Sequence, residues 1–440
     1  MKTYIELEEK MTRLSSPGIR PGLERIRRLL DLLGNPEEAF PAVHIVGTNG
    51  KGSVSEFISA IFRESGYSVA MYTSPHLENP SERLLIDGTP VGLSAWENAV
   101  TRIETALMRD AILKSDPPSF FEIVTTAAFL LTAERNVDIA VMEAGLGGRL
   151  DATNCLKNVL VTVVTSISMD HMEYLGDTLE KISDEKFSVM RPGAPCIFSG
   201  DPDSLVSRFR SFASGNGTPG YLLSDLVSIS SPAISLDETS FVLKSKRTSF
   251  EARIITPLLG TYQIQNGALS AAACIELSPR FPRLSTSTIL SGFRKARWPG
   301  RLERFGTSPV VLLDGAHNTG GMKRLVESIR TLLPGENITV LFAAMRDKDY
   351  RENFRLLSDI TQNLVCTTVP GMERAAPAEM LLSTARSFHW NVPPSAWDDP
   401  VAAFHELLKG SEYILCCGSL YFIGFIRPHI RRWSEGVFGE

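Results

Sequence analysis

The stretch HIVGTNGKGS, residues 44–53, constrains the fold more than any other part of the chain. The apolar run AVHIV at 42–46 leads into it, as expected of a buried strand. The residues after it are apolar at the spacing of one helix face: Val54, Phe57, Ile58, Ile61 and Phe62. Gly66 is placed to end that helix. The sequence therefore predicts a strand, a glycine-rich loop and a helix in direct succession.

This glycine-rich loop has the parts of a phosphate cradle. Backbone N–H groups at the N-terminus of a helix point toward an anion, and Lys51 adds a positive charge for the outer phosphates of a nucleotide. The spacing departs from the common NTPase pattern G-x-x-x-x-G-K-[ST], because Gly47 is two residues too close and Gly52 separates the lysine from Ser53. A glycine-rich turn that binds no nucleotide is the alternative, and the flanking strand and helix favour the phosphate loop.

The rest of the chain alternates between predicted strands and helices. Further apolar runs typical of buried parallel strands lie at 67–74, 137–145 and 158–167. We predict an α/β fold with a P-loop-type open, mostly parallel sheet, and a small β-rich insertion where 219–256 becomes rich in Ser and Thr. A smaller Rossmann-like α/β domain is expected after 297–301. The predicted domains are residues 1–298 and 299–440.

Composition excludes several classes of partner. The formal net charge of −5 gives no electrostatic reason to expect nucleic acid or an anionic membrane. The N-terminal segment MKTYIELEEKM carries acidic residues where a signal peptide needs an apolar core, and the apolar run at 159–167 is too short to span a bilayer. The six cysteines form no C-x-x-C pair, so buried reduced thiols are expected. We therefore predict a cytoplasmic protein and take it as a monomer.

Three polar residues stand where chemistry is possible. Glu143 ends an apolar strand, so its carboxylate is expected at the sheet edge that carries the phosphate loop, where it would suit Mg²⁺; a carboxylate that only bonds turn amides is the alternative. His171 follows Asp170 beyond another strand, and such a histidine taken alone is more often structural. Lys186 shares one predicted helix stripe with Ile182, where a lysine must be paired, deprotonated or extended to solvent.

The loop GTNGKGS resembles the ATP loop of the Mur ligase superfamily, and the glycine after its lysine resembles the folate branch, the dihydrofolate synthase/folylpolyglutamate synthase family. The resemblance continues in order through TSPHL (73–77), SFFE (119–122), EAGLGGRLDATN (143–154), DHMEYLG (170–176), LLGTYQIQN (258–266), WPGRLE (298–303), DGAHN (314–318), RDKD (346–349) and GSLY (418–421). It departs from the family at Tyr262, where histidine is common, and at AAMRDKD, which replaces an approach richer in glycine.

The resemblance implies which residues bind the nucleotide and the metal. ATP would contact Thr48, Asn49, Gly50, Lys51, Gly52, Ser53, Asn266, Arg301, Asp314 and His317. Two magnesium ions would share Glu143, one also near Ser53 and the other held by Ser74 and His171. The expected catalytic residues are Lys51, Glu143, His171 and Lys186. Lys186 matches a lysine that reacts with CO₂ to form a carbamate, N6-carboxylysine. For Arg301 the alternative, without the resemblance, is an ordinary solvated arginine.

A pterin or pteroate pocket is also implied by the resemblance. Its residues would be Arg83, Ser119, Phe120, Phe121, Glu122, Leu150, Asp151 and Ala152. Flat heteroaromatic rings stack favourably on aromatic side chains, although Phe120 and Phe121 taken alone would be core residues.

The implied activity is ATP-dependent ligation of L-glutamate to dihydropteroate, giving dihydrofolate, and to the γ-carboxylate of tetrahydrofolate, through an acyl phosphate. The first alternative is a folylpolyglutamate synthase without the dihydropteroate activity, because the distinction rests on a few residues of GLGGRLDATN. A nucleotide-dependent switch is a second alternative, but the sequence contains no N-K-x-D motif. A peptidoglycan-precursor Mur ligase is a third, which Gly52 and TSPHL disfavour. The expected partners are small-molecule substrates and Mg²⁺.

Overall fold

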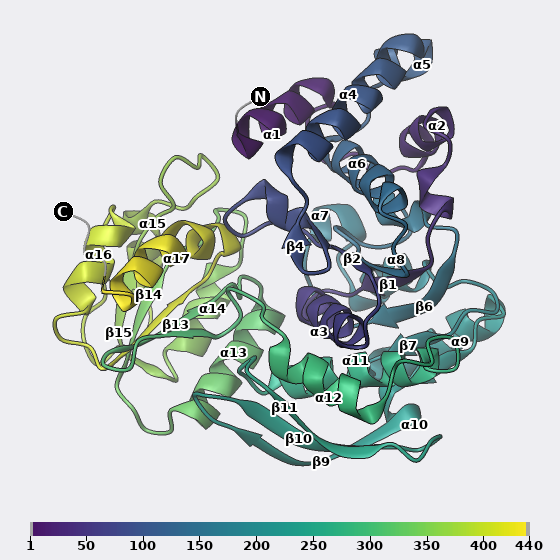
Figure 1. Cartoon of the computed structure of the whole chain (residues 1–440). Coiled ribbons are helices and arrows are strands. Elements are labelled where there is room, and N and C mark those ends of the chain that lie inside the picture. Colours follow the sequence, from purple (N-terminus) through teal and green to yellow (C-terminus); the bar gives the residue numbers. More distant parts are fainter. Residues whose placement is uncertain (1–2, 437–440) are drawn as a thin grey trace. The chain divides into compact units, whose positions relative to one another are not determined.

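The computed structural model describes residues 3–436, which divide into two compact units (Figure 1). The N-terminal unit contains the chain up to Ser231, together with Phe241–Ile255 and Gln265–Ala296. The C-terminal unit contains Pro232–Ser240, Thr256–Ile264 and the chain from Arg297 onward.

A large sheet lies at the centre of the N-terminal unit, with the strand order β4-β3-β2-β5-β1-β6-β7-β8. The strands are β1 Ala42–Val46, β2 Val69–Tyr72, β3 Leu84–Ile86, β4 Thr89–Pro90, β5 Ile139–Glu143, β6 Val159–Val164, β7 Cys196–Phe198 and β8 Gly220–Leu222. All pairs are parallel except β2 with β3 and β3 with β4 at one edge. Every residue of the central β1 is buried, as in a strand covered on both faces. The predicted open, mostly parallel sheet is confirmed.

The helices of this part of the chain are α1 Tyr4–Leu14, α2 Glu24–Leu32, α3 Lys51–Glu64, α4 Leu93–Arg109, α5 Ala111–Ser115, α6 Phe120–Glu134, α7 Met172–Leu175, α8 Leu179–Phe187, α9 Val206–Gly215, α10 Leu223–Leu226, α11 Tyr262–Leu277 and α12 Thr286–Lys295. They pack on the sheet, as α3 does, or on one another, as α1, α4 and α6 do. Short 3₁₀ helices are η1 Pro36–Glu38, η2 Pro80–Arg83, η3 Ala152–Cys155 and η4 Asp203–Leu205. The division between the units falls inside α11, after Ile264.

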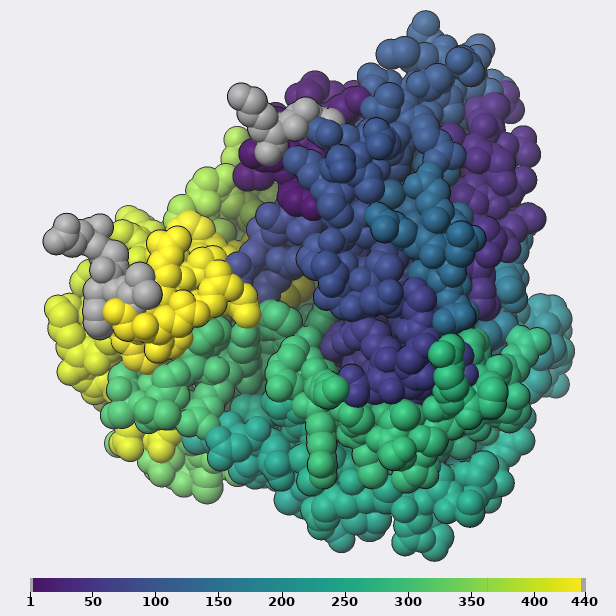
Figure 2. All heavy atoms as spheres, in the orientation of Figure 1, coloured from purple at the N-terminus to yellow at the C-terminus, as the bar shows by residue number. Residues whose placement is uncertain are grey.

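The helix that follows the phosphate loop is fixed by close packing against α12. A Cβ on Gly292 of α12 would lie 2.5 Å from the Cα of Ile61 in α3, so the two backbones approach where a side chain has no room. The rings of Phe57 and Phe293 lie 4.9 Å apart. In Figure 2 the dark purple atoms of the α3 part of the chain lie directly beside the green atoms of the α12 part. The middle and the last turns of α3 are therefore held by α12.

The segment predicted as a β-rich insertion is only partly a separate structure. Residues 220–222 form β8, an edge strand of the large sheet. The remainder forms a three-stranded sheet in the order β11-β10-β9, with β9 Val227–Ile234, β10 Thr239–Ser245 and β11 Glu251–Thr256. The Ser- and Thr-rich composition of 219–256 predicted the smaller sheet correctly, but this sheet begins later, at Val227.

The C-terminal unit is a second α/β layer structure. Its sheet has the order β12-β13-β17-β14-β15-β16, and only the β12–β13 pair is antiparallel. The strands are β12 Glu303–Phe305, β13 Val310–Asp314, β14 Ile338–Phe342, β15 Thr361–Cys366, β16 Ser395–Ala396 and β17 Tyr413–Cys417. The helices are α13 Thr319–Leu332, α14 Tyr350–Leu357, α15 Ala378–Ala385, α16 Pro400–Leu407 and α17 Leu420–Ser434. The predicted smaller α/β unit is confirmed as a fold.

Across residues 3–436, none of the helices is both long enough and apolar enough to cross a membrane.

Candidate active site

The predicted phosphate loop joins the central strand β1 to the first turn of α3 (Figure 1). Gly47 and Gly50 adopt positive φ angles of 147° and 92°. A Cβ on Gly47 would lie 1.8 Å from Thr165 Oγ1, so the position accepts only glycine. The loop is also tied to the segment after β6, because the Thr48 N–H donates to the Ser166 carbonyl over 2.8 Å. A rigid backbone turn thus precedes a helix N-terminus, which is the arrangement that binds phosphate.

Lys51 bends back over this loop toward the sheet edge. Its Nζ donates to the carbonyl oxygens of Gly47 at 3.2 Å and Thr48 at 3.1 Å. The same Nζ lies 4.0 Å from Glu143 Oε1, and both side chains are mostly buried. Glu143 is the last residue of β5, whose neighbour β1 leads directly into the loop. The structure therefore brings Lys51 and Glu143 together at the carboxyl end of the sheet, as predicted.

Lys186 reaches the same loop from α8. Only 3% of this residue is exposed, so its predicted position on the inward face is confirmed. Its Nζ donates to the Gly47 carbonyl over 2.8 Å, the oxygen that also accepts from Lys51. Burial, and secondly the charge of Lys51, lower the pKa of Lys186 to about 7. A large share of this amine is consequently neutral at physiological pH.

The residues expected to bind magnesium come from α3, from the end of β5 and from the segments that follow β2 and β6. Ser74 follows β2, Glu143 ends β5, Ser53 lies buried in the first turn of α3, and His171 precedes α7. The His171 side chain is 43% exposed, and its Nε2 lies 4.0 Å from Asp170 Oδ2. No group of three or more His, Cys, Asp or Glu that could hold a metal occurs within residues 3–436.

This donor set fits a magnesium ion that arrives with a nucleotide. Mg²⁺ takes oxygen ligands, keeps several waters, and is commonly held by one or two carboxylates together with substrate phosphates. Glu143 is one buried carboxylate beside a phosphate loop, and Ser53 and Ser74 supply hydroxyl oxygens. A site of this composition needs no cluster of three acidic side chains.

The predicted pteroate-side residues of α6 divide into two kinds. Ser119 and Glu122 form a capping box at the helix start, where the Ser119 N–H donates to Glu122 Oε2 over 2.7 Å. Arg25 Nε also donates to that carboxylate at 3.3 Å. These two residues therefore fix the start of α6, whereas Phe120 and Phe121, both partly exposed, remain as ring surfaces.

Phe121 lies between the predicted pteroate-side residues of α6 and the turn that follows Glu143, an expected magnesium ligand. A Cβ on Gly145 would lie 2.5 Å from the Phe121 ring, so the ring is packed on the backbone of the turn that begins after Glu143. The ring also lies 6.3 Å from that of Tyr72 at the end of β2. One turn of the chain thus contacts both an expected metal ligand and an expected pterin-side ring.

Arg83 is buried at the end of η2 beside Phe120. Its guanidinium lies 5.7 Å from the centre of the Phe120 ring, and its Nε donates to His76 Nδ1 over 3.1 Å. Burial, and secondly the charge of Arg83, lower the pKa of His76 to about 4, so this imidazole is a neutral acceptor. Arg83 and Phe120, which were predicted separately for the pteroate side, therefore lie next to each other.

Sequence reasoning missed the N-terminal helix. Arg83 and Phe120 line a small cavity together with four residues of α1: Tyr4, Leu7, Glu8 and Met11. Leu7 and Met11 are apolar and four residues apart, a spacing that indicates a buried helix face. From the sequence, we considered this segment only as a possible signal peptide. The charge of Arg83 also acts on Glu8, although burial is the larger influence and raises the pKa of Glu8.

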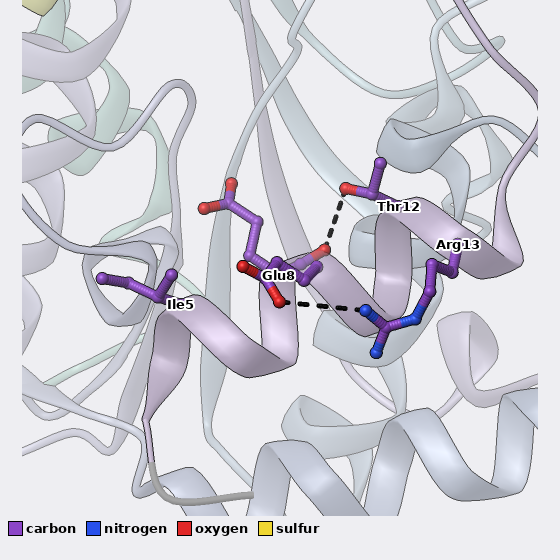
Figure 3. Close-up of a pocket in the computed structure, with 5 residues that line it drawn as sticks. Ile5, Glu8, Thr12 and Arg13 are labelled. Carbon is purple, nitrogen blue, oxygen red and sulfur yellow. Dashed lines mark hydrogen bonds and ion pairs between the residues drawn. The ribbon is translucent and has the colours of Figure 1, made fainter. Parts of the chain in front are cut away.

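A second pocket lies on the outer face of α1 and belongs to none of the predicted sites. Figure 3 shows Ile5, Glu8, Thr12 and Arg13 around it. Two of its polar contacts lie within the helix, since the Thr12 hydroxyl donates to the Glu8 carbonyl and Arg13 Nη1 lies 3.8 Å from Glu9 Oε2 (Figure 3).

The predicted residues at 150–152 lie in the turn that runs into η3, and Ala152 is also the first residue of η3. Leu150 is partly exposed, while Asp151 and Ala152 are buried. Asp151 Oδ2 accepts the Leu146 N–H at 2.8 Å, and Oδ1 accepts the Thr153 N–H at 2.9 Å. The Asp151 carboxylate thus organises its own turn, which places Leu150 and Ala152.

Three of the four distant nucleotide residues gather in the C-terminal unit around Gly315. Asp314 ends β13, and a Cβ on Gly315 would lie 2.4 Å from Arg301 Nη1. His317 Nδ1 lies 2.9 Å from the Gly315 carbonyl oxygen. Asn266 belongs to the N-terminal unit, where its Oδ1 lies 2.5 Å from the position of a Cβ on Gly50. Asn266 is therefore beside the phosphate loop, as expected of a nucleotide contact.

The unusual Tyr262 has a defined structural partner. Its hydroxyl donates to Asp314 Oδ2 over 2.8 Å, an oxygen that also accepts the Leu302 N–H at 2.9 Å. Asp314 Oδ1 accepts the Ala316 N–H. Burial raises the pKa of Asp314, and the attraction of Arg301 opposes that rise.

Comparisons with known proteins find relatives in sequence and in structure. The chain matches the family models "Mur ligase middle domain" over residues 45–274 and "Mur ligase, glutamate ligase domain" over residues 300–420. It is 36% identical to the dihydrofolate synthase/folylpolyglutamate synthase of Bacillus subtilis, over 94% of this chain and 96% of that protein.

Two solved structures are similar over nearly their whole length. Folylpolyglutamate synthase of Mycobacterium tuberculosis complexed with ADP has a TM-score of 0.88 at 27% identity and covers 97% of this chain and 98% of its own. FolC of Escherichia coli in complex with DHPP and ADP has a TM-score of 0.86 at 26% identity and covers 98% of both chains.

Proposed function

This chain belongs to the Mur ligase family, in its dihydrofolate synthase/folylpolyglutamate synthase branch, and we propose on that premise that it ligates L-glutamate to dihydropteroate and to the γ-carboxylate of tetrahydrofolate with cleavage of ATP. The similar structure of FolC from Escherichia coli is a complex with DHPP and ADP. The proposed compartment is the cytoplasm, and the proposed state is a monomer.

One arrangement carries this proposal: the turn after β5 serves two substrates. Glu143, at its start, lies beside Lys51 of the phosphate loop, and Gly145, two residues later, lies against the Phe121 ring. A carboxylate that is to react with the γ-phosphate of ATP must lie close to it. A phosphate loop and an aromatic surface joined by one short turn meet that requirement.

The carboxylate of the pteroate is a poor electrophile, so it must be activated before an amine can attack it. A carboxylate oxygen of the pteroate attacks the γ-phosphorus, a new P–O bond forms, and the bond to the β–γ bridging oxygen breaks to release ADP. Lys51 and the loop N–H groups offset the negative charge that gathers on the transferring phosphoryl oxygens. The glutamate amine then attacks the acyl carbon, loses a proton, and expels phosphate with the former carboxylate oxygen. The product is an amide.

Magnesium would be held by Glu143 and Ser53, and a second ion by Glu143, Ser74 and His171. When bound, it supplies positive charge that draws electron density from the phosphoryl oxygens. The buried carboxylate of Glu143 also keeps the nearby Lys51 ammonium close to the loop, because opposite charges attract strongly in a partly dry site.

Lys186 is proposed to carry a carbamate. A neutral amine attacks CO₂, and burial supplies that neutral form near pH 7. The carbamate would replace a cation beside Lys51 with an anion, which relieves the repulsion between the two lysines. Its oxygen atoms would support the metal side of the loop.

For the pterin, the proposed surface consists of Phe120 and Phe121 with Arg83. The two rings offer stacking faces, and Arg83 adds a buried positive charge beside Phe120. Leu150 and Ala152 would complete the surface from the opposite turn. Ser119, Glu122 and Asp151 support these groups from behind rather than through exposed contacts.

ADP release measured with MgATP and L-glutamate tests the activity. We expect turnover when dihydropteroate is added and again when tetrahydrofolate replaces it, with none when glutamate is left out. Lys51→Ala and Glu143→Gln are expected to lower both rates by at least about 100-fold, because each removes charge that the phosphoryl transfer needs.

Turnover with tetrahydrofolate alone would leave only the folylpolyglutamate synthase half of the proposal. Turnover with neither acceptor would overturn the proposed activity. Near-normal rates in either variant, with an unchanged circular dichroism spectrum, would remove the role given to that residue.

A further inference from the structure

A buried histidine lies in the strand that leads into the phosphate loop. His44 is fully buried at the centre of β1, three residues before Gly47. Its Nε2 lies 2.9 Å from Thr153 Oγ1, a residue 109 positions later in the chain. Thr153 belongs to η3, directly after the turn that carries Leu150, Asp151 and Ala152. The contact therefore joins the strand of the phosphate loop to the turn proposed to face pteroate.

The direction of the hydrogen bonds follows from the donors present. Asp151 Oδ1 accepts from the Thr153 hydroxyl at 2.5 Å, and its two oxygens also accept backbone N–H groups. Because the carboxylate only accepts, the single hydroxyl proton of Thr153 points to Asp151. The Thr153 oxygen must then accept from His44 Nε2–H. The chain of donation runs from His44 to Thr153 to Asp151.

Protonation of His44 at Nε2 leaves Nδ1 as a buried acceptor, which costs free energy if it has no donor. Nδ1 of His44 is buried and has no hydrogen-bond partner in the part of the chain that the structure describes. Burial, and secondly the charge of Arg191, lower the pKa of His44 to about 3, so the ring stays neutral. An apolar residue at this core position would avoid an unsatisfied nitrogen. The donor at Nε2 is therefore the feature that favours histidine here.

Strand and turn differ in how firmly they are held. β1 is paired with β5 on one side and β6 on the other, and all five of its residues are buried. The turn at 150–152 leads into a 3₁₀ helix of four residues, where hydrogen bonds are poorer. Loss of the link would consequently displace the turn rather than the strand.

We propose that His44 and Thr153 are positioning residues for the pteroate substrate, which hold Asp151 and with it the turn at 150–152 in register with the phosphate-loop strand. This inference rests on the proposed function, because it assigns the turn to the pteroate side. Neither residue touches the reacting atoms. Their effect is on the affinity for the pteridine acceptor and not on the affinity for ATP.

Steady-state kinetics of Thr153→Val test this assignment. Valine keeps the shape but removes both hydrogen bonds of the hydroxyl, so the KM for dihydropteroate should rise about tenfold while the KM for ATP stays within about twofold. Thr153→Ser keeps the hydroxyl and should return the KM for dihydropteroate close to the wild-type value. Thr132→Val is the matched control, because Thr132 is a buried threonine of α6 whose hydroxyl has no partner among the described residues.

A second pair of variants covers the case in which Thr153→Val does not fold. His44→Gln retains a side-chain N–H donor, and His44→Leu removes it, so only the leucine variant should raise the KM for dihydropteroate. In wild-type protein labelled with ¹⁵N, the His44 resonances should be those of a neutral ring protonated at Nε2. This spectrum requires no catalytic activity.

Several outcomes would overturn the inference. These are an unchanged KM for dihydropteroate in the folded valine and leucine variants, an equal rise in the KM values for ATP and dihydropteroate, or an Nδ1-protonated His44. An inactive wild-type enzyme would instead contradict the proposed function, and the ¹⁵N spectrum would still report on the hydrogen-bond chain.

Discussion

Two lysines donate to one carbonyl oxygen of the phosphate loop. Lys51 and Lys186 both have Nζ within hydrogen-bond distance of Gly47 O, at 3.2 and 2.8 Å. Two ammonium groups so close together repel each other, and burial adds a desolvation cost for the inner one. The structure resolves this conflict at Lys186, whose pKa falls to about 7, whereas Lys51 has Glu143 nearby.

The lowered pKa predicts how stability changes with pH. Unfolding returns Lys186 to its ordinary pKa of 10.5, so the unfolded chain binds more protons than the folded one between pH 7 and 10.5. The contribution of Lys186 to stability therefore increases as the pH rises through this window. Relative to Lys186→Met, the wild type should gain roughly 1 kcal/mol of unfolding free energy for each pH unit between about pH 7.5 and 9.5.

Urea denaturation in CO₂-free buffer measures this difference. Subtracting the methionine variant removes the contributions of other titrating groups. A difference that stays constant with pH, or that shrinks as the pH rises, would show that Lys186 keeps an ordinary pKa and would weaken the case for a carbamate.

Elements with a strong local pattern could be predicted, and contacts between distant residues could not. β1, the loop and α3 follow from apolar spacing and glycines within about two dozen residues of sequence. The hydrogen bond between His44 and Thr153 joins residues 109 positions apart, and no periodic pattern in the sequence predicts it. Asp151 was expected to face pteroate, but its buried hydrogen bonds to its own turn are set by the fold and not by the motif.

The start of α11 depends on a residue that departs from the family pattern. Tyr262 is the first residue of this helix, and its hydroxyl donates to the buried Asp314. Tyr262→Phe should lower the free energy of unfolding by roughly 1–3 kcal/mol, because the buried carboxylate loses a donor. Denaturation followed by circular dichroism measures the change.

The control for this variant is Tyr421→Phe, since Tyr421 is an exposed tyrosine on α17 of the same unit. It should leave the stability within about 0.5 kcal/mol of the wild type. Equal stability of the two variants would show that the Tyr262 hydroxyl contributes nothing to the C-terminal unit.

Over the whole molecule, the two mostly parallel sheets could be predicted because buried parallel strands are near-continuous apolar runs. The sequence did not predict which segments belong to which compact unit. Residues 232–240 and 256–264 belong with the C-terminal unit, although they precede its sheet in sequence. Short segments of this kind carry no composition that tells which core they pack on. The residues predicted to bind ATP also fall in both units, because the phosphate loop belongs to the N-terminal unit and Asp314 to the C-terminal unit.

The central claim is that this chain activates a pteroate carboxylate with ATP and transfers it to glutamate. Dihydropteroate labelled with ¹⁸O in its carboxylate, incubated with MgATP and L-glutamate, tests the claim most directly by mass spectrometry of both products. We expect a pteridine product heavier by one glutamyl residue, and one ¹⁸O atom in the inorganic phosphate for each amide formed. ADP release without the glutamyl product, or a glutamyl product with unlabelled phosphate, would contradict it.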